Sequence, residues 1–403
     1  MGKPKIRFKG YEDAWEQRKL DGWGTFYYGR SCPKWSVTED ATIPCIRYGE
    51  LYTKFGAKID RVYSYTNMPP ENLRFSKGTE VLIPRVGEDP MDYNHCTWLS
   101  MPDVAIGEMI SVFNTDNNPL FTATMFNATL QNEFAMRVEG GSVTNLYFEK
   151  LKNIEVSFPS IQEQEKIAAY FENLDHLITL HQRKCEETKS LKKYMLQKMF
   201  PENGKCVPEI RFSGFSDAWE QRKVSELLQE RNEQAPMSEE YPLMAFIANQ
   251  GVAPKGDRYD RSALVNDETG KKYKRTEFGD FIYSSNNLET GSIGLNKYGN
   301  ACISPVYSIF KPTGKADLDF LGRRFLRKDF INEMVKWRQG VVYGQWKIHE
   351  TDFLNIVVTV PTIEEQKRIG DFLDGLDSLI TLHQHKCDEL QKLKKFMLQN
   401  MFV

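Results

Sequence analysis

The residues of this chain that could bind a metal ion are two His–Cys pairs, His181 with Cys185 and His383 with Cys387. Each pair has an i, i+4 spacing, which places both side chains on one face of a helix. Four such ligands could bind zinc if two helices crossed at these positions. Structural zinc sites usually hold their cysteines in tight loops, so we favour a polar pair that fixes the register of a helix seam. We therefore expect no metal site in this chain.

Motifs for catalysis or for cofactor binding are not found in the sequence. Residues 314–316 lack the hydroxyl residue and the upstream glycine of a phosphate-binding loop, and no glycine-rich cofactor loop follows a predicted strand. Residues 67–70 superficially match the Asn-Pro-Pro-Tyr motif of amino-methyltransferases, but an inserted methionine and a missing aromatic favour a turn. His95 and His349 have no obvious partners. The sequence thus predicts a protein without a catalytic site and without a cofactor of its own.

The composition restricts the class of protein further. A length of 403 residues predicts two or three domains, and a net charge of -2 gives no general basicity for nucleic-acid binding. The seven cysteines include no CxxC pair, which favours free thiols in a reducing compartment. No apolar run reaches the ~18–20 residues of a membrane span, and the N-terminus lacks the apolar region of a signal peptide. We expect a cytoplasmic protein that does not interact with membranes.

The elements that must position these residues are revealed by an internal repeat. Residues 158–200 align with residues 360–402 without a gap over 43 positions, of which 24 are identical. A shorter pair, residues 4–20 and 208–224, shares 12 of 17 positions. The blocks between them, roughly 21–157 and 225–359, show little resemblance to each other. The chain is therefore a duplicated unit in which the frame was kept and the insert was changed.

Each long repeat is predicted to be a helix with a coiled-coil seam. Pro159 and Pro361 precede a capping Ser160 or Thr362, and acidic residues follow in the first turn. Residues 162–200 would extend about 58 Å at ~1.5 Å per residue. The seam residues recur at alternating steps of four and three: Ile167, Phe171, Leu174, Ile178, His181 and Cys185, then Ile369, Leu373, Leu376, Ile380, His383 and Cys387. We expect the two helices to pair antiparallel about a pseudo-two-fold axis; packing of each helix on its own globular block is the less favoured alternative.

The inserts have a different texture, with short β-like runs such as Val81–Ile83 and Phe281–Tyr283 between turn signals. Each predicts a mixed α+β domain of about 150 residues. Lys and Arg outnumber Asp and Glu by seven to four in residues 47–85, by seven to four in 254–275 and by seven to two in 321–347. Basic residues can hold phosphates, and Arg, Asn and Gln can read base edges. A solvated charged surface is the commoner origin of any single cluster, so the clusters alone favour DNA only weakly.

These motifs resemble those of type I restriction-modification specificity subunits (HsdS). The resemblance rests on Pro-x-Ile-x-Glu-Gln at 159–164 and 361–366 and on Leu-Asp-x-Leu-Ile at 174–178 and 376–380. Residues 43–49, 344–348 and 352–356 fit more loosely, and the similarity covers essentially the whole chain. Residues 145–148 stand where the second insert has 345–348, so a polar contact is better supported in the second copy.

The resemblance implies a fold and a set of partners. The fold would be α+β, with two globular target recognition domains separated by two long antiparallel coiled-coil helices in a pseudo-two-fold repeat. The parts would be residues 1–157 and 201–359 as recognition domains, and 158–200 and 360–403 as spacer helices. The partners would be double-stranded DNA, two methyltransferase subunits and two restriction subunits. S-adenosylmethionine, ATP and Mg²⁺ would be bound by those subunits and not by this chain.

Each recognition domain would then read one half of a bipartite, asymmetric DNA site, and the complex would modify DNA and restrict phage DNA. The helices would set the spacing, since ~58 Å corresponds to about 17 base pairs. The residues that we expect to contact DNA are Arg47, Tyr48, Lys54 and Arg85 in the first domain and Asn286, Arg338, Gln345 and Lys347 in the second. Two other classes remain as alternatives: a self-contained nuclease or methyltransferase, and a coiled-coil scaffold that binds only protein.

Overall fold

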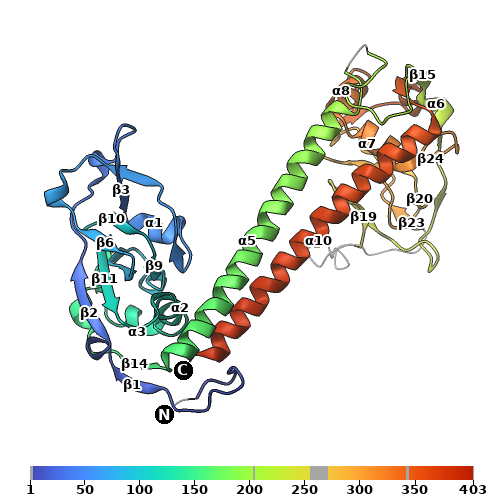
Figure 1. Ribbon diagram of the computed structural model, residues 1–403. Helices are drawn as coiled ribbons and strands as arrows, with labels where there is room; N and C mark the ends of the chain where they lie inside the picture. Colours follow the sequence, from blue (N-terminus) through green and yellow to red (C-terminus); the bar gives the residue numbers. More distant parts are fainter. Residues whose placement is uncertain (1–2, 203–204, 255–270, 342–344, 403) are drawn as a thin grey trace. The chain divides into compact units, whose positions relative to one another are not determined.

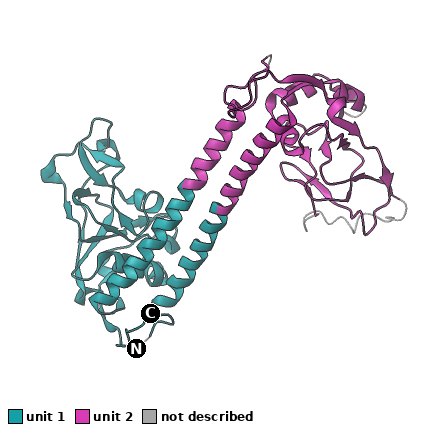
Figure 2. Ribbon diagram, turned by 45° about the vertical axis from the view of Figure 1, so that its right-hand side comes forward, with its two compact units in different colours: residues 1–183, 383–403 teal, residues 184–382 magenta. Residues whose placement is uncertain are grey.

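The computed structural model describes residues 3–202, 205–254, 271–341 and 345–402. They form two compact units, shown in Figure 2: unit 1 comprises residues 1–183 and 383–403, and unit 2 comprises residues 184–382. Two long helices, α5 (Ile161–Lys198) and α10 (Ile363–Met401), each contribute one part to either unit. The four-part division at 157/158, 200/201 and 359/360 stays a prediction, because each unit combines a globular part with a segment of both helices.

Unit 1 is built from short strands and short helices (Figure 1). Its strands are β1 (Glu16–Lys19), β2 (Gly24–Tyr28), β3 (Ile43–Ile46), β4 (Lys58–Ile59), β5 (Ser64–Thr66), β6 (Phe75–Lys77), β7 (Glu80–Pro84), β8 (Val86–Gly87), β9 (Thr97–Leu99), β10 (Pro102–Ile106), β11 (Ile110–Thr115), β12 (Glu139–Gly140), β13 (Thr144–Asn145) and β14 (Glu155–Phe158). Its helices are α1 (Tyr48–Thr53), α2 (Pro119–Thr129), α3 (Gln131–Ala135) and α4 (Phe148–Leu151), with 3-10 turns at Leu20–Gly22, Lys34–Ser36, Pro70–Asn72 and Pro90–Asp92. The sheet orders are β2-β11-β7-β9-β4, β5-β3-β10-β6 and β12-β13-β8.

Unit 2 is likewise built from short strands and short helices (Figure 1). Its strands are β15 (Glu220–Lys223), β16 (Leu228–Glu230), β17 (Gln234–Ala235), β18 (Ala245–Ile247), β19 (Gly251–Ala253), β20 (Tyr273–Thr276), β21 (Phe281–Tyr283), β22 (Ile293–Leu295), β23 (Ala301–Ile303), β24 (Ser308–Pro312), β25 (Gln339–Val341), β26 (Gln345–Lys347) and β27 (Val357–Val360). Its helices are α6 (Val224–Leu227), α7 (Leu318–Phe325), α8 (Lys328–Val335) and α9 (Glu350–Asn355). The larger sheets have the orders β16-β24-β21-β22 and β17-β20-β23.

The short repeat forms the frame of each globular part. Strand β1 pairs antiparallel with β14, and β15 pairs with β27 in the same way, so the short motif lies beside the strand that leads into each long helix. Trp15 and Trp219 are buried in the cores of their units. Arg7 makes a bidentate ion pair with Glu163 at 2.7 and 2.8 Å. In unit 2 the equivalent pair joins Arg211 to Glu365, at 2.7 Å through both nitrogens.

The glutamine of the Pro-x-Ile-x-Glu-Gln motif connects each long helix to its globular part. Gln164 Nε2 donates to the carbonyl of Pro159 at 2.9 Å, and its Oε1 accepts from the Asn118 N–H at 2.9 Å. Gln366 makes the equivalent bond to the N–H of Asp317, also at 2.9 Å. Both contacted residues are N-caps, because the Asn118 and Asp317 side chains accept from the third residue of α2 and α7. The motif therefore fixes the start of one helix against the start of another.

The two long helices run antiparallel within each unit, as predicted. In unit 1, Asp175 of α5 forms an ion pair with Lys394 of α10, and in unit 2 Lys192 of α5 pairs with Asp377 of α10. The two ion pairs join equivalent positions of the repeat. The fold class predicted from the sequence, two α+β domains with long coiled-coil helices, is confirmed.

The seam residues are shared between the helix pair and the globular cores. Three of the first copy and three of the second are buried among residues of their own globular part: Ile167, Phe171 and Leu174 in unit 1, and Ile369, Leu373 and Leu376 in unit 2. The ends of the partner helices enter the same cores, with Met401 and Phe402 in unit 1 and Met199 and Phe200 in unit 2. The alternative in which each helix packs on its own globular part is therefore partly right. The apolar stripe of each helix contacts both the partner helix and the globular core.

The middle of the seam is less buried. Ile178, Cys185 and Cys387 are buried, whereas Ile380 and the two histidines are half-buried. His181 Nδ1 and His383 Nδ1 lie 3.0 Å apart in unit 1, so the histidines of the two helices contact each other directly. No described helix is both long and apolar enough to cross a membrane.

Candidate nucleic-acid interface

A turn at residues 107–109 brings two of the unit 1 candidates together. Arg47 follows β3, whose last carbonyl accepts a hydrogen bond from the Gly107 N–H at 2.9 Å. Arg85 follows β7, and its Nη1 donates to the carbonyl of Glu108 at 3.3 Å. Both arginines therefore lie at the same end of unit 1, although 38 positions of sequence separate them.

The Arg85 side chain is held between aromatic rings. Its guanidinium carbon lies 4.9 Å from the ring centroid of Tyr28 and 5.8 Å from that of Tyr147. Burial, together with the hydrogen bond from Tyr28 Oη to Glu149 at 2.7 Å, raises the pKa of Tyr28 to about 12. The phenol is therefore neutral at physiological pH and supports the guanidinium by stacking rather than by charge.

The other two unit 1 candidates lie at the two ends of α1. Tyr48 is the first residue of this helix, and Lys54 follows its last residue. Six residues of helix extend only about 9 Å, which keeps both candidates near the same surface. The Nζ of Lys54 lies 5.8 Å from the ring of Tyr63, and the guanidinium of Arg61 lies 5.3 Å from that ring. Arg61 was not among the predicted contacts; its place on the exposed Tyr63 ring adds it to this surface.

The cations of residues 47–85 are largely without acidic partners. Among the described residues, only Lys58 of this group forms an ion pair, with Glu172 at 2.6 Å. The remaining six cations are Arg47, Lys54, Arg61, Arg74, Lys77 and Arg85. Cations that no neighbouring acid neutralises are available to attract the phosphates of a nucleic acid.

In unit 2, all four candidates gather at the hairpin of β25 and β26. Gln345 and Lys347 lie on β26, which pairs antiparallel with β25, and Arg338 directly precedes β25. Asn286 Oδ1 accepts a hydrogen bond from the Trp346 N–H at 2.6 Å. Gly344, the first residue of the 344–348 motif, lies outside the described residues.

The charges of unit 2 differ from those of unit 1 because most of them are paired. Arg338 Nη1 bonds Glu289 at 2.8 Å, and Lys347 Nζ bonds Glu350 at 2.7 Å. Four further cations of the 321–347 cluster pair with acids: Arg323 with Asp374 and Asp377, Arg324 and Arg327 with Asp329, and Lys336 with Glu333. The excess of seven to two in the sequence is therefore mostly a set of internal ion pairs. Arg338 still has two buried donors, Nε and Nη2, without a partner in the described chain.

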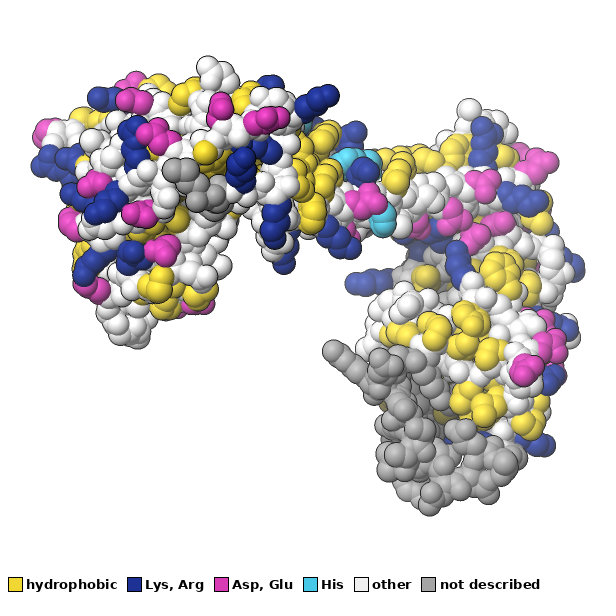
Figure 3. Space-filling model, turned by 90° about the horizontal axis from the view of Figure 1, so that it is seen from below, with side chains coloured by type: hydrophobic (Ala, Val, Ile, Leu, Met, Phe, Trp, Pro, Cys, Tyr) yellow, Lys and Arg dark blue, Asp and Glu magenta, His cyan; other side chains and the backbone are white. Residues whose placement is uncertain are grey.

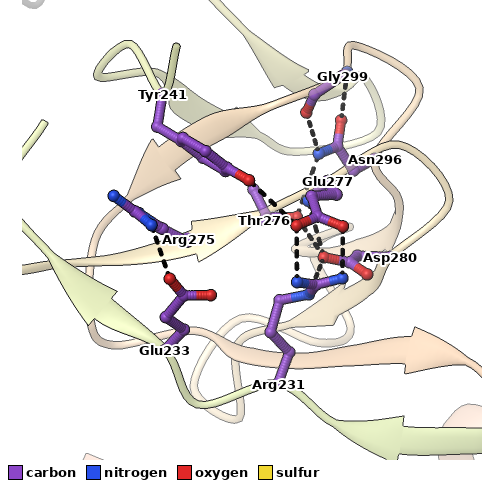
Figure 4. Close-up of polar contacts among 9 residues, drawn as sticks. All are labelled: Arg231, Glu233, Tyr241, Arg275, Thr276, Glu277, Asp280, Asn296 and Gly299. Carbon is purple, nitrogen blue, oxygen red and sulfur yellow. Dashed lines mark hydrogen bonds and ion pairs between the residues drawn. The ribbon is translucent and has the colours of Figure 1, made fainter. Parts of the chain in front are cut away.

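A partly buried polar network connects β20 to its neighbouring segments in unit 2 (Figure 4). Arg231 bonds both carboxylate oxygens of Glu277, at 2.9 and 2.8 Å, and its Nε lies 2.9 Å from Asp280. Burial raises the pKa of Asp280, which also accepts from the Glu277 N–H at 2.8 Å. Arg275 Nη1 bonds Glu233 at 2.7 Å. This arginine of the 254–275 cluster is thus part of the scaffold.

Lys274 of the same cluster is also structural. Its Nζ donates to the carbonyl of Tyr307 at 2.9 Å, and burial lowers its pKa. Residues 255–270, which supply three of the basic residues counted in this cluster, lie outside the described chain. For the second insert, then, counting charges gave little information about the surface.

The long helices expose a second feature that the sequence reasoning missed. Large apolar side chains, 39% to 53% exposed, occur at equivalent positions of both helices. They are Leu177, Leu393 and Phe396 in unit 1 and Leu379, Leu191 and Tyr194 in unit 2. Figure 3 shows hydrophobic side chains gathered along the helices. The identity of the two copies was the signal that could have revealed these positions, because exposed apolar residues kept twice indicate a shared contact.

The zinc alternative finds no geometric support. The described residues contain no group of three or more His, Cys, Asp or Glu side chains placed to hold a metal ion. Cys185 Sγ lies 3.9 Å from the carbonyl of Ile380, and Gln391 Nε2 lies 3.8 Å from Cys387 Sγ. The His–Cys positions are therefore part of the helix packing.

Comparison with known proteins identifies the family. The family model of the type I restriction modification DNA specificity domain matches residues 103–190 and 216–392, well over half of the chain. Both matched segments run from a globular part into a long helix. The chain belongs to the family of type I restriction-modification specificity subunits.

Two curated relatives come from Methanocaldococcus jannaschii. The chain is 23% identical over 253 residues to a specificity subunit named for the type I restriction enzyme MjaX, covering 61% of this chain and 58% of the relative. It is 22% identical over 281 residues to the MjaVIII specificity subunit, covering 64% of each. The match thus spans about three fifths of these relatives. A solved structure, the S subunit of a type I restriction-modification system from M. genitalium, has a similar fold, with a TM-score of 0.59 at 14% identity over 100% of this chain and 99% of that one.

Proposed function

We propose that this chain is the non-catalytic DNA-reading subunit of a type I restriction-modification complex. Unit 1 and unit 2 each read one half of a bipartite, asymmetric target. The observation that carries this proposal is that the two units share the contacts that join each globular part to its helices but differ in their candidate DNA surfaces. The Arg–Glu pairs, the Gln contacts and the Asp–Lys helix pairs occur twice, whereas the candidate DNA surfaces differ in both residues and charge pairing. Two units with the same helix junctions can bind two identical protein partners, and two different DNA surfaces can read two different half-sites.

Two methyltransferase subunits are the partners that the helices would dock. The exposed apolar residues of α5 and α10 support this, since each unit presents two leucines and one aromatic residue at equivalent positions. Two restriction subunits complete the assembly and supply ATP-driven cleavage. S-adenosylmethionine, ATP and Mg²⁺ belong to these subunits in this proposal, and the complex acts on double-stranded DNA in the cytoplasm.

The lengths of the helices suit the role of a spacer. Helix α5 has 38 residues and α10 has 39, so each extends about 57 Å at ~1.5 Å per residue. That length corresponds to about 17 base pairs of DNA. The spacing between the two half-sites would then be set by the helices rather than by either recognition surface.

The test is a chimaera in which residues 225–359 replace residues 21–157, so that both frames carry the second insert. Coexpressed with the methyltransferase subunit, the natural chain should direct methylation to an asymmetric bipartite sequence, detected by methylation mapping of genomic DNA. The chimaera should direct methylation to an inverted repeat of one half-site. The reciprocal chimaera, with residues 21–157 in both frames, serves as the matched control and should select the other half-site. Methylation of the unchanged asymmetric sequence by either chimaera would refute the assignment of one half-site to each unit.

The two alternative classes are tested with the same proteins. A self-contained methyltransferase would transfer methyl groups from S-adenosylmethionine to DNA as the purified chain alone, which we expect not to occur. A scaffold that binds only protein would leave the methyltransferase complex without sequence-specific protection of DNA. Specific footprints at the mapped target, lost when residues 21–157 are exchanged, distinguish the proposed function from both.

A further inference from the structure

Trp35 is an unusual residue of unit 1. It lies in the segment between β2 and β3, and 72% of its side chain is exposed, whereas Trp15 is 3% exposed. No aromatic or cation–π contact to its ring is found within the described part of the chain. Single exposed apolar side chains are common on protein surfaces. A binding role for this ring therefore has to be argued from the loop and the charges around it.

The segment that carries Trp35 begins at the candidate DNA-contacting end of unit 1. The Arg30 N–H donates to the carbonyl of Ile106 at 2.8 Å, and the Glu108 N–H donates to the carbonyl of Ser31 at 3.0 Å. The same Glu108 offers its carbonyl to Arg85. The Trp35 loop and the Arg85 surface are thus connected through one turn.

The backbone of this loop is held in a costly conformation. Ser31 and Cys32 have φ angles of 61° and 71°, in the left-handed region that residues other than glycine seldom adopt. Two consecutive residues of this kind persist only where the surroundings fix them, and such strain is concentrated at functional sites. The Cys32 side chain is buried, which holds this end of the loop against unit 1.

The other end of the loop is equally fixed. Ser36 is fully buried; its Oγ donates to the carbonyl of Pro33 at 2.8 Å and accepts from Thr66 Oγ1 at 2.7 Å. The Asn67 N–H donates to the carbonyl of Ser36 at 2.9 Å. Trp35 is therefore an exposed ring on a loop that is pinned on both sides, so little conformational freedom remains to be lost when it binds.

The charges around the ring favour a polyanion. Arg30 and Lys34 are both exposed, and neither has a side-chain partner in the described chain. Residues 29–37 include no acid; the acids Glu39 and Asp40 follow only after the buried Ser36. An exposed aromatic ring on a loop that also carries two unneutralised cations is a combination by which proteins bind bases and phosphates together.

We propose that Trp35 stacks on a base of the half-site that unit 1 reads and acts as a wedge at one base step. The inference rests on the proposed function, since it requires that unit 1 binds DNA. A protein partner shared by both units is disfavoured, because the stretch of unit 2 that follows β16, residues 231–244, offers no exposed aromatic ring: its one aromatic residue, Tyr241, is only 9% exposed. Trp35 therefore belongs to the part of unit 1 that differs from unit 2, which is the part proposed to read DNA.

The experiment uses the chain in complex with its methyltransferase subunits and a duplex that carries the mapped target. 2-Aminopurine replaces one adenine at a time in the first half-site, so that a rise in fluorescence reports unstacking. Trp35→Ala should abolish the rise at one step and raise Kd for the target by about 5- to 100-fold. Trp35→Phe should retain most of both effects, whereas Trp35→Leu can still open the base step but cannot stack on the base, so it should lose most of the affinity. Thermal unfolding should be unchanged in all three, because the side chain is exposed.

Three outcomes overturn the inference. Unchanged Kd and fluorescence for Trp35→Ala show that the ring does not touch the bases, and equal rescue by Leu and Phe shows an apolar contact without stacking. A Trp35→Ala chain that fails to assemble with the methyltransferase subunits in the absence of DNA shows a protein contact instead. The proposed function fails separately: in that case Arg47→Ala and Arg85→Ala also leave target affinity unchanged.

Discussion

At the scale of single residues, the two candidate surfaces differ in how their charges are compensated. Lys54 of unit 1 contacts the ring of Tyr63 and has no acidic partner in the described chain, whereas Lys347 of unit 2 is bonded to Glu350 at 2.7 Å. A lysine that is free of an internal acid can neutralise a phosphate and release a counterion. A lysine already paired within the protein contributes less, because its acid must first be separated from it.

This difference gives a prediction about salt dependence. Lys54→Ala should weaken binding of the complex to all DNA sequences alike and should reduce the slope of log Kd against log salt by about 1. Lys347→Ala is the matched control and should change the slope by less than half as much. Fluorescence anisotropy over a range of salt concentrations measures both. Equal slopes for the two variants would contradict the roles that the ion pairing suggests.

The same contrast shows what the sequence could reveal at this scale. Counting charges indicated an excess of cations in residues 47–85 and in 321–347 alike, yet most cations of the second cluster are paired, some with acids nearby in the sequence and two with acids far from it. Arg338 meets Glu289 across 49 positions, and Arg323 meets Asp374 across 51. Such pairs cannot be read from local composition. The predicted DNA contacts therefore stay predictions, with the geometry favouring those of unit 1.

At the scale of elements, the junction between each long helix and its globular part depends on one buried carboxylate. Glu163 is fully buried in the first turn of α5 and is bonded twice by Arg7, which is 15% exposed. The pair raises the pKa of Arg7 through its hydrogen bonds with Glu163. Removal of one partner from such a pair leaves the other charge buried without compensation, which costs more than the pair itself contributes.

Glu163→Gln should therefore lower the free energy of unfolding of the chain by about 2–4 kcal/mol. Glu16→Gln is the control, because its ion pair with Arg18 is exposed and contributes about 0–1 kcal/mol. Denaturant unfolding monitored by circular dichroism compares the two variants. A loss below 1 kcal/mol for Glu163→Gln would show that the junction does not depend on this pair.

The two long helices were predictable from the sequence, since the seam, the cap signals and the absence of internal proline all agreed. The sequence did not show that the seam residues also pack into the globular cores. Phe171 and Leu373 have the periodicity of a coiled coil, yet they are buried in the globular cores as well. An apolar position looks the same in the sequence whether it meets a helix or a sheet. Only the three-dimensional structure separates the two contacts.

At the scale of the whole molecule, the end of the chain completes a core that its beginning starts. The ring of Phe402 packs against Trp15, Phe121 and Phe171, with centroids at 6.5, 5.6 and 5.7 Å. In unit 2 the equivalent Phe200 packs against Trp219 and Phe320. The sequence showed the Met–Phe pair at the end of each repeat without showing its role. Because Phe402 fills a core that is otherwise built from residues far earlier in the sequence, we expect unit 1 to be stable only when the end of α10 is packed into it.

Phe402→Ala tests this dependence. Loss of a buried phenylalanine should destabilise unit 1 by about 3 kcal/mol, and Phe200→Ala should destabilise unit 2 by a similar amount. Hydrogen exchange resolves the two, because protection should fall in β1 and β14 for the first variant and in β15 and β27 for the second. The decisive result is that each variant loses protection in strands far from the substituted residue in the sequence. Phe402 lies 387 positions from Trp15 but packs against it. Loss of protection confined to the last turns of α10 would mean that the chain end is an accessory to unit 1 and not part of its core.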